Sequence, residues 1–181
     1  MRLGQEIPGV LETERLLMLP WDRDNWPQLK QIAQDPEVVR YISNGQPWTE
    51  ERIRQFVDRQ VACYSQRGFC LWRLLDKTMR EMIGFCGLQP LDQTPEIEIG
   101  WWLARLQWGK GLATEAAREA LRDGFGRVGL QRIVAIAQPA NHASVHIMQK
   151  LGMSFERETT HRGICVALYA LNKKAYAAKQ D

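Results

Sequence analysis

The stretch WGKGLATEAA, from Trp108 to Ala117, sets two glycines around a lysine directly before an alanine-rich segment. It does not fit a P-loop, because Ala104 stands at the first glycine position and Gly111 stands where Ser or Thr should follow the lysine. It fits a dinucleotide fingerprint poorly, because Thr114 occupies the third glycine position. The glycines permit a tight loop with open N–H groups beside a helix start, which suits a pyrophosphate. A plain strand-to-helix turn is the alternative.

A second set of polar groups lies on the strand-like segment EIEIGWW, residues 96–102. Alternation puts Glu96, Glu98, Gly100 and Trp102 on one face of this strand and Ile97, Ile99 and Trp101 on the other. A carboxylate in mid-strand can be partly buried, which raises its pKa and suits it to act as a general base. Glu98 is therefore the better candidate base, and the alternative is that both glutamates line a solvated face.

The segment NHASVHIMQKLG, residues 141–152, carries a third set. Asn141 precedes a predicted helix, where its amide can cap the helix, bind a ligand, or do both. Ser144 lies almost one turn further on. His142 and His146 stand four apart, but without a HExxH pattern or a third ligand they do not predict a metal site.

These residues need a mixed α+β frame to position them. Apolar periodicity and turn residues predict strands at 14–19, 69–75, 81–91, 96–104 and 131–138, followed by a hairpin of 153–160 and 164–171 that turns at 161–163. Helices are predicted within 23–42, from Thr49 to Gln66, from Ala113 onward, at 141–152 and from about Asn172. The order implies an antiparallel meander with one strand–helix–strand crossover in the middle.

Composition limits the classes of protein that fit. The chain has 181 residues, which suits one domain spanning 1–181, and 45% hydrophobic and 25% charged residues are typical of globular proteins. Twenty-four basic against 21 acidic residues are scattered along the chain, so we expect no direct nucleic-acid partner. No apolar run is long enough to span a bilayer, and we expect a cytoplasmic protein without a membrane partner. Four cysteines without metal-ligand spacing predict reduced thiols and no zinc.

Several linked motifs in one order resemble the GNAT superfamily of acetyl-CoA-dependent N-acetyltransferases, and more narrowly its Rim-type branch, which acetylates ribosomal-protein N-termini. The motifs run from ETERLLML through DPEVVRYI, IGFCGL, EIGWWL, WGKGLATEA and NHASVHIMQKLGM to VALYAL. The resemblance implies a single domain with a mixed, mostly antiparallel twisted sheet of about six to seven strands and flanking helices. It also implies that this sheet is splayed between its fourth and fifth strands, with acetyl-CoA as cosubstrate and no metal.

The resemblance also implies roles for individual residues. Glu98 matches the glutamate that serves as base in several members, and Ser144 is a substitute acid for a tyrosine whose place here is Met148. The implied cofactor-binding residues are Trp102, Leu103, Trp108, Gly109, Lys110, Gly111, Leu112, Ala113, Thr114, Asn141 and Ser144. Trp108 departs from the general loop pattern, which has Arg or Gln there, and this leaves open whether a side chain assists the amides.

Two classes of function follow. The first is an N-acetyltransferase in which an amine attacks the thioester directly in a ternary complex; the second is a CoA-binding regulatory or interaction module without turnover. A peptide N-terminus and a small-molecule amine are both compatible acceptors. An edge strand or the C-terminal hairpin would allow a homodimer.

Overall fold

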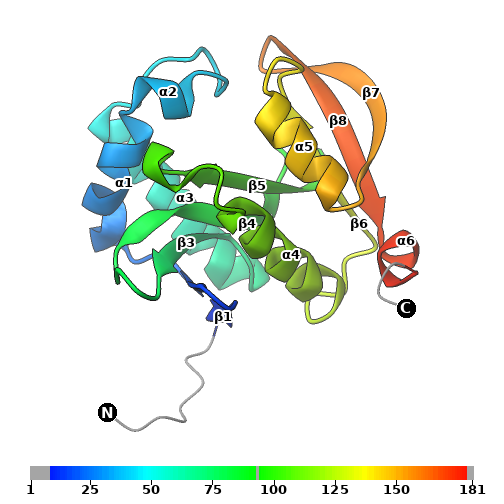
Figure 1. Cartoon of the computed structure of the whole chain (residues 1–181), viewed down its shortest axis with the longest axis horizontal. Helices are drawn as coiled ribbons and strands as arrows, with labels where there is room; N and C mark the ends of the chain where they lie inside the picture. Colours follow the sequence, from blue (N-terminus) through cyan, green and yellow to red (C-terminus); the bar gives the residue numbers. More distant parts are fainter. Residues whose placement is uncertain (1–8, 93, 179–181) are drawn as a thin grey trace, which may run out of the picture.

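The computed structural model describes residues 9–92 and 94–178, and its frame is an eight-stranded sheet in the order β1-β2-β3-β4-β5-β6-β8-β7 (Figure 1). The strands are β1 (Leu11–Glu12), β2 (Leu16–Leu19), β3 (Leu71–Asp76), β4 (Met82–Pro90), β5 (Ile97–Leu103), β6 (Arg132–Ala137), β7 (Ser154–His161) and β8 (Ile164–Asn172). The helices are α1 (Trp26–Ala33), α2 (Pro36–Val39), α3 (Glu50–Arg67), α4 (Leu112–Phe125), α5 (His142–Lys150) and α6 (Lys173–Ala177), with short 3-10 turns at Arg23–Asn25 and Arg105–Gln107.

The first half of the sheet is the predicted meander. Strands β2 to β5 pair antiparallel with their neighbours in sequence, because the connections after β3 and β4 are short and polar. Helix α3 lies behind β4 in Figure 1 and packs its Phe56 ring 4.9 Å from that of Phe85, while α4 covers the other face. This half is therefore a sheet buried on both faces.

Helix α3 begins at its predicted cap and is closed by a glycine. The Thr49 hydroxyl accepts a hydrogen bond from the Arg52 amide at 3.2 Å, which caps the first turn. Gly68 follows the last turn at a φ of +73° and donates its amide to the Tyr64 carbonyl. The helix thus extends one residue beyond the predicted Gln66.

The crossover β5-α4-β6 places two parallel strands side by side, and they separate almost at once. The register between them consists of Glu98 opposite Val134, whereas β4 follows β5 along its length from Gly84–Leu103 to Pro90–Ile97. Strand β6 pairs instead with β8 over Arg132–Ala137. Because β1 is not among the predicted strands, β5 and β6 are the predicted fourth and fifth strands, so the predicted splay is confirmed. Glu98 lies where it begins.

Two details differ from the expected elements. The sheet has eight strands rather than six or seven, because Leu11–Glu12 pairs with Leu17–Met18 as a two-residue strand too short to show a pattern. Helix α4 begins at Leu112, one residue before the predicted Ala113, and ends at Phe125. Buried alanines on α4, including Ala116, Ala117 and Ala120, let it lie close to the sheet.

Within the described residues, no helix is both long and apolar enough to cross a bilayer.

Candidate active site

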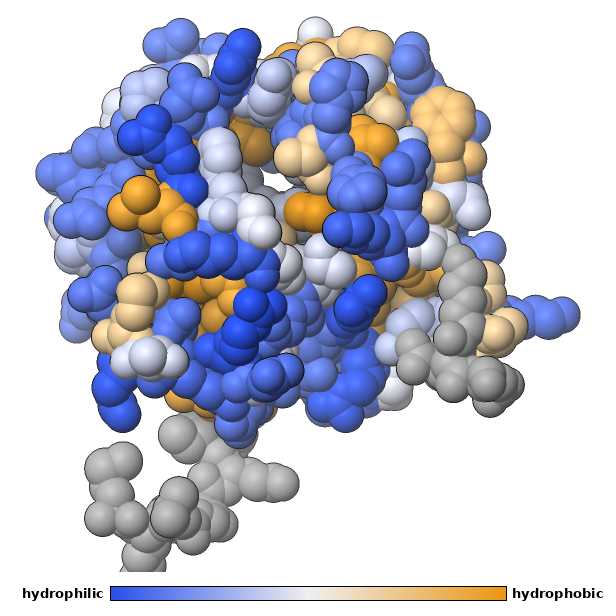
Figure 2. Space-filling view, in the orientation of Figure 1, coloured by the Kyte–Doolittle hydropathy of each residue, from blue (hydrophilic) through white to orange (hydrophobic). Residues whose placement is uncertain are grey.

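A cleft of about 580 Å³ opens where β5 and β6 separate. Its walls come from α3, β4, β5, the end of β6, α5 and the β7–β8 turn. Figure 2 shows the molecule hollowed at this place, in the upper centre of the view. Of the residues predicted from sequence, Glu98, Trp102, Asn141 and Ser144 line this cleft together.

Glu98 is held in the cleft by a chain of amide side chains. Gln89 donates its Nε2 to the Glu98 carboxylate at 2.6 Å, and Gln60 donates its Nε2 to Gln89 at 3.0 Å. The Gln60 carbonyl oxygen in turn accepts the backbone N–H of Leu71 at 2.9 Å, which fixes the buried Gln60. The orientation of the carboxylate is therefore set before any ligand binds.

Burial raises the pKa of Glu98 from 4.5 to about 7. The Gln89 hydrogen bond and Arg162 oppose this rise, and the Asp92 carboxylate nearby contributes to it. A carboxyl group with a pKa close to neutral pH is half ionised there and accepts a proton more strongly than an exposed carboxylate.

Aromatic rings line the same cleft. Trp102 lies with its ring centroid 4.6 Å from that of Trp48 and 5.1 Å from that of Phe85. Trp48 is 7% exposed, and its buried indole N–H has no hydrogen-bond partner among the described residues. Trp21 is in the core and Trp26 lies under Arg54 outside the cleft, whereas Trp48 forms part of the cleft wall.

The opposite wall is α5. The Asn141 side-chain oxygen accepts the backbone N–H of Ser144 at 3.2 Å, so Asn141 is a helix cap and a lining residue at once. Met148, at the position of the missing tyrosine, is 1% exposed and also lines the cleft. It carries no proton to give, which leaves Ser144 as the hydroxyl on this part of α5.

The glycine loop, residues 108–111, lies away from this cleft at the start of α4. Gly109 and Gly111 have φ values of +75° and +79°, and a side chain on Gly109 would meet no atom within 4 Å. The Trp108 indole N–H donates to the Leu103 carbonyl at 2.9 Å, which ties the loop to the end of β5. Lys110 donates its Nζ to the Gln107 side chain at 3.0 Å.

The backbone N–H groups at 109–114 make no hydrogen bond to any other described residue. The first amides of a helix lack intrahelical acceptors, and Gly111 as N-cap supplies no side chain to them. Arg15 lies beside the loop, donating its Nη1 to the Lys110 carbonyl at 2.9 Å and pairing with Glu115. The predicted loop residues are thus together, with Leu112 and Ala113 buried and Trp108 half exposed.

Several residues of the site were not predicted from sequence. Gln89 and Gln60 are glutamines without a motif, and only the strand pairing of Gln89 with Glu98 brings them to the carboxylate. Arg52 and Arg59 lie seven apart on α3, so helical periodicity signals that they share a face, but not what that face meets. Arg162 lies in the β7–β8 turn, whose sequence is that of an ordinary polar hairpin turn and does not indicate a functional residue.

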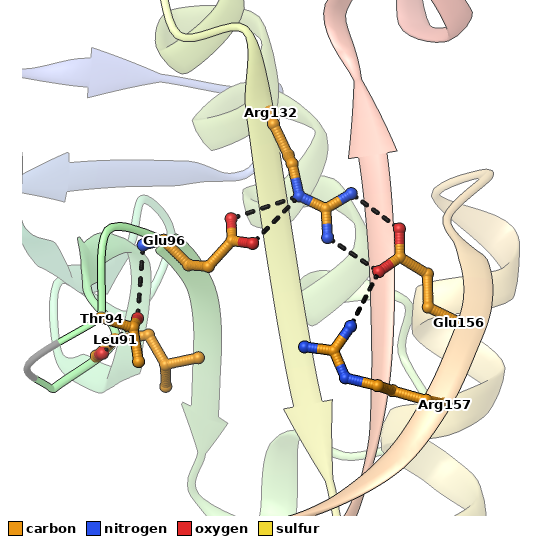
Figure 3. A network of polar contacts seen from close by, with 6 residues as sticks. All are labelled: Leu91, Thr94, Glu96, Arg132, Glu156 and Arg157. Carbon is orange, nitrogen blue, oxygen red and sulfur yellow. Dashed lines mark hydrogen bonds and ion pairs between the residues drawn. The ribbon is translucent and has the colours of Figure 1, made fainter.

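The closed end of the splay is built differently. Arg132 on β6 donates its Nε to Glu96 at 3.2 Å and its Nη1 to Glu156 at 2.7 Å, and Arg157 also approaches Glu156 (Figure 3). Glu96 and Glu98, two residues apart on one strand, therefore have different partners. Glu96 holds the strands together, and Glu98 faces the cleft.

No group of three or more His, Cys, Asp or Glu side chains in residues 9–92 and 94–178 has a metal-binding arrangement. The four cysteines are free thiols, of which Cys70 and Cys86 are buried.

Comparison with known proteins agrees with the geometry. Residues 15–154 match the model of the acetyltransferase (GNAT) domain. The chain is 32% identical over 182 residues to the uncharacterized N-acetyltransferase p20 of Bacillus licheniformis, covering 93% of this chain and 98% of that one.

Solved structures have the same fold. A GNAT-family acetyltransferase from Bacillus anthracis superposes with a TM-score of 0.78 at 27% identity, covering 91% of this chain and 99% of that one. RimL, a ribosomal L7/L12 α-N-protein acetyltransferase in complex with coenzyme A, superposes with a TM-score of 0.75 at 19% identity, covering 92% and 99%. The chain therefore belongs to the GNAT family of N-acetyltransferases.

Proposed function

We propose that this protein transfers the acetyl group of acetyl-CoA to a primary amine by direct attack of the amine on the thioester in a ternary complex. The observation that carries the proposal is the position of Glu98, a carboxyl group with a pKa of about 7 at the opening of the splay. An amine near pKa 8 to 10 is mostly protonated at neutral pH, so a nearby base is what the reaction needs from the protein.

The free amides at 109–114 support the binding of the cosubstrate. They form a set of parallel donors at the positive end of α4, where a pyrophosphate is stabilised without a lysine or arginine side chain. Trp108, Gly109, Lys110, Gly111, Leu112, Ala113 and Thr114 are the residues we assign to this role. Trp102, Leu103 and Asn141 are assigned to the rest of the cofactor, along the strand and helix that flank the splay.

The transfer balances as follows. The amine nitrogen forms a bond to the thioester carbonyl carbon, the carbon–sulfur bond breaks, and the amide and a thiol leave. Glu98, directly or through water, takes the proton that the amine gives up. Ser144 is the hydroxyl we assign to relaying a proton from solvent to the thiolate, since Met148 cannot do so, and Glu98 releases its proton to solvent to restore the starting state.

The acceptor is a peptide α-amine, as the Rim-type resemblance implies, or a small-molecule amine. A CoA-binding module without turnover is the alternative that the missing tyrosine favours.

Thiol release from acetyl-CoA across a panel of amines tests the proposal. Turnover with any amine excludes the module without turnover. Saturable acetyl-CoA binding without thiol release in the presence of peptides, polyamines, aminoglycosides or amino acids contradicts the proposal that the protein is an enzyme. Acetyl-CoA binding that is unchanged in Gly111→Trp contradicts the assignment of the loop.

A further inference from the structure

Three guanidinium groups face the same cleft as Glu98. Arg52 and Arg59 lie two turns apart on one face of α3, and Arg162 reaches the cleft from the β7–β8 turn, about a hundred residues later in the chain. We call these three residues the arginine cluster. They lie on different elements, so only the fold brings them together.

The carboxylates nearby do not neutralise the arginine cluster. Arg162 is paired with Asp92, through its Nε at 3.0 Å. Arg52, half buried, donates its Nη2 to the Ser43 hydroxyl at 3.0 Å and lies 4.4 Å over the Trp48 ring, and neither of these partners carries a charge. Arg59 has no hydrogen bond or ion pair within the described ranges, and the carboxylate that attracts it, Asp92, is already paired with Arg162. Two of the three guanidinium groups therefore have no counter-charge of their own.

The pKa values of these arginines agree with this lack of counter-charge. Burial and the mutual repulsion with Arg162 lower the pKa of both Arg52 and Arg59. Four arginines line the cleft, including Arg67, against the carboxyl groups of Asp92 and Glu98. Holding like charges together without a counter-ion costs free energy, and a bound anion removes that cost.

We propose, on the basis of the function proposed above, that the acceptor is a small primary amine that also carries an oxyanion, a carboxylate or a phosphate. Its amine lies at Glu98, and its oxyanion lies at the arginine cluster. Planar guanidinium groups match both oxyanions with paired hydrogen bonds, so the two share one recognition chemistry.

The phosphates of the cosubstrate are not the anions that this cluster suits. The residues assigned to the pyrophosphate, 108–114, do not line the cleft, and the pantetheine arm that would reach Glu98 carries no charge. The cluster therefore serves the acceptor side.

Two contacts cross from one wall of the cleft to the other. Gln138 at the end of β6 donates its Nε2 to the Tyr41 carbonyl at 3.0 Å, which spans from β6 to the segment between α2 and α3. Asp92 and Arg162 span from the β4–β5 connection to the β7–β8 turn. A volume of about 580 Å³, which the acetyl end of the cosubstrate shares, suits a small molecule.

A matched series of amines tests the inference in the full-length protein. Putrescine, aminobutanol and γ-aminobutyrate share one carbon chain and end in a cation, a neutral group and a carboxylate, and aminopropyl phosphate supplies the second oxyanion. Shorter and longer homologues of each cover the reach between Glu98 and the cluster. We expect kcat/KM for an oxyanion-bearing amine to exceed that of its neutral and cationic partners by at least about tenfold, the effect of one charge-assisted contact.

A charge reversal on α3 provides the decisive variant. Arg59→Glu should invert the preference, so that putrescine becomes a better substrate than γ-aminobutyrate. The control is Arg54→Glu, which makes the same change on the same helix at a residue stacked 3.7 Å over Trp26 and outside the cleft, and it should retain the wild-type order.

The outcomes separate the two proposals. Turnover in which the neutral or cationic amine equals or exceeds its oxyanion-bearing partner at every chain length overturns this inference and leaves the proposed function standing. An equal change of preference in Arg59→Glu and Arg54→Glu also overturns it. If none of the amines supports thiol release, the proposed function is overturned, and this inference falls with it.

Discussion

The glycine loop and the arginine cluster both suit anions, but they do so by different means. At the loop, the donors are backbone amides at 109–114, and the neighbouring Lys110 and Arg15 side chains are occupied with Gln107 and Glu115. At the cluster, the donors are long side chains from α3 and from the β7–β8 turn. Backbone amides cannot change with the sequence, whereas guanidinium groups can be exchanged one at a time. A shared cosubstrate and a protein-specific acceptor fit this division.

The largest expected effect is the loss of kcat on replacing Glu98, the residue at which we propose that the cosubstrate and the acceptor react. Glu98→Gln keeps the hydrogen bond from Gln89 but removes the base, so we expect kcat to fall about 10²- to 10⁴-fold. In the wild type, kcat should rise with pH through a midpoint of about 7 and then level off, because the ionised carboxylate is the active form. A variant that retains kcat within a few-fold of wild type, with the same pH profile, would exclude Glu98 as base.

The same variant should gain stability. Burial raises the pKa of the Glu98 carboxyl from 4.5 to about 7, so the folded state binds this proton more tightly than the unfolded state does. The free energy of unfolding therefore falls as pH rises from 4.5 to 7 and stays lower above it. We expect Glu98→Gln to raise the free energy of unfolding at pH 8 by at most about 3 kcal/mol and at pH 4 by little, measured by urea denaturation.

Glu96→Gln is the control for this stability gain. Glu96 is paired with Arg132, so its neutralisation removes an ion pair and should lower the stability or leave it unchanged at pH 8. If Glu98→Gln were no more stable than Glu96→Gln at that pH, the Glu98 carboxylate would not be desolvated in solution.

The loop half of the comparison is tested by one glycine. Gly109→Val disfavours the φ of +75° that sets the direction of the free amides, and we expect KM for acetyl-CoA to rise at least about tenfold, equivalent to one lost charge-assisted hydrogen bond. Gly129→Val is matched, because Gly129 also has a positive φ, +79°, and open space around it, but it lies outside the glycine loop and the cleft. Both variants should lose similar stability, and an equal rise of KM in both would refute the loop assignment.

The smallest expected effect concerns Gln89, a positioning residue. Its hydrogen bond lowers the pKa of Glu98, so Gln89→Leu should move the midpoint of the kcat profile above 7 and reduce kcat severalfold at pH 7. Gln89→Glu should move the midpoint in the same direction, since a second carboxylate disfavours ionisation. A midpoint that stays in place in both variants, with only stability lost, would assign Gln89 a purely structural role.

The elements and the loop were predictable because their causes are local. Thr49 and Gly68 mark the ends of α3 through hydrogen bonds within one or two turns, and the glycines at 109 and 111 reveal themselves by a conformation that other residues rarely adopt. Alternation along 96–102 predicts Glu98 and Trp102 on one face, and both line the cleft, but so do Ile99 and Trp101 of the other face. The strand Leu11–Glu12 was missed because two residues cannot show a period.

What the sequence by itself determined is the order of elements, the glycine loop and the strand that carries the candidate base, since each depends on residues close together in the chain. Only the tertiary structure decided which of two similar glutamates faces the cleft, because that depends on Arg132 meeting Glu96 and on Gln89 meeting Glu98 across paired strands. It also decided that Arg52, Arg59 and Arg162 share one cavity with Glu98. Such contacts join segments up to about a hundred residues apart, and no local pattern of side chains encodes them.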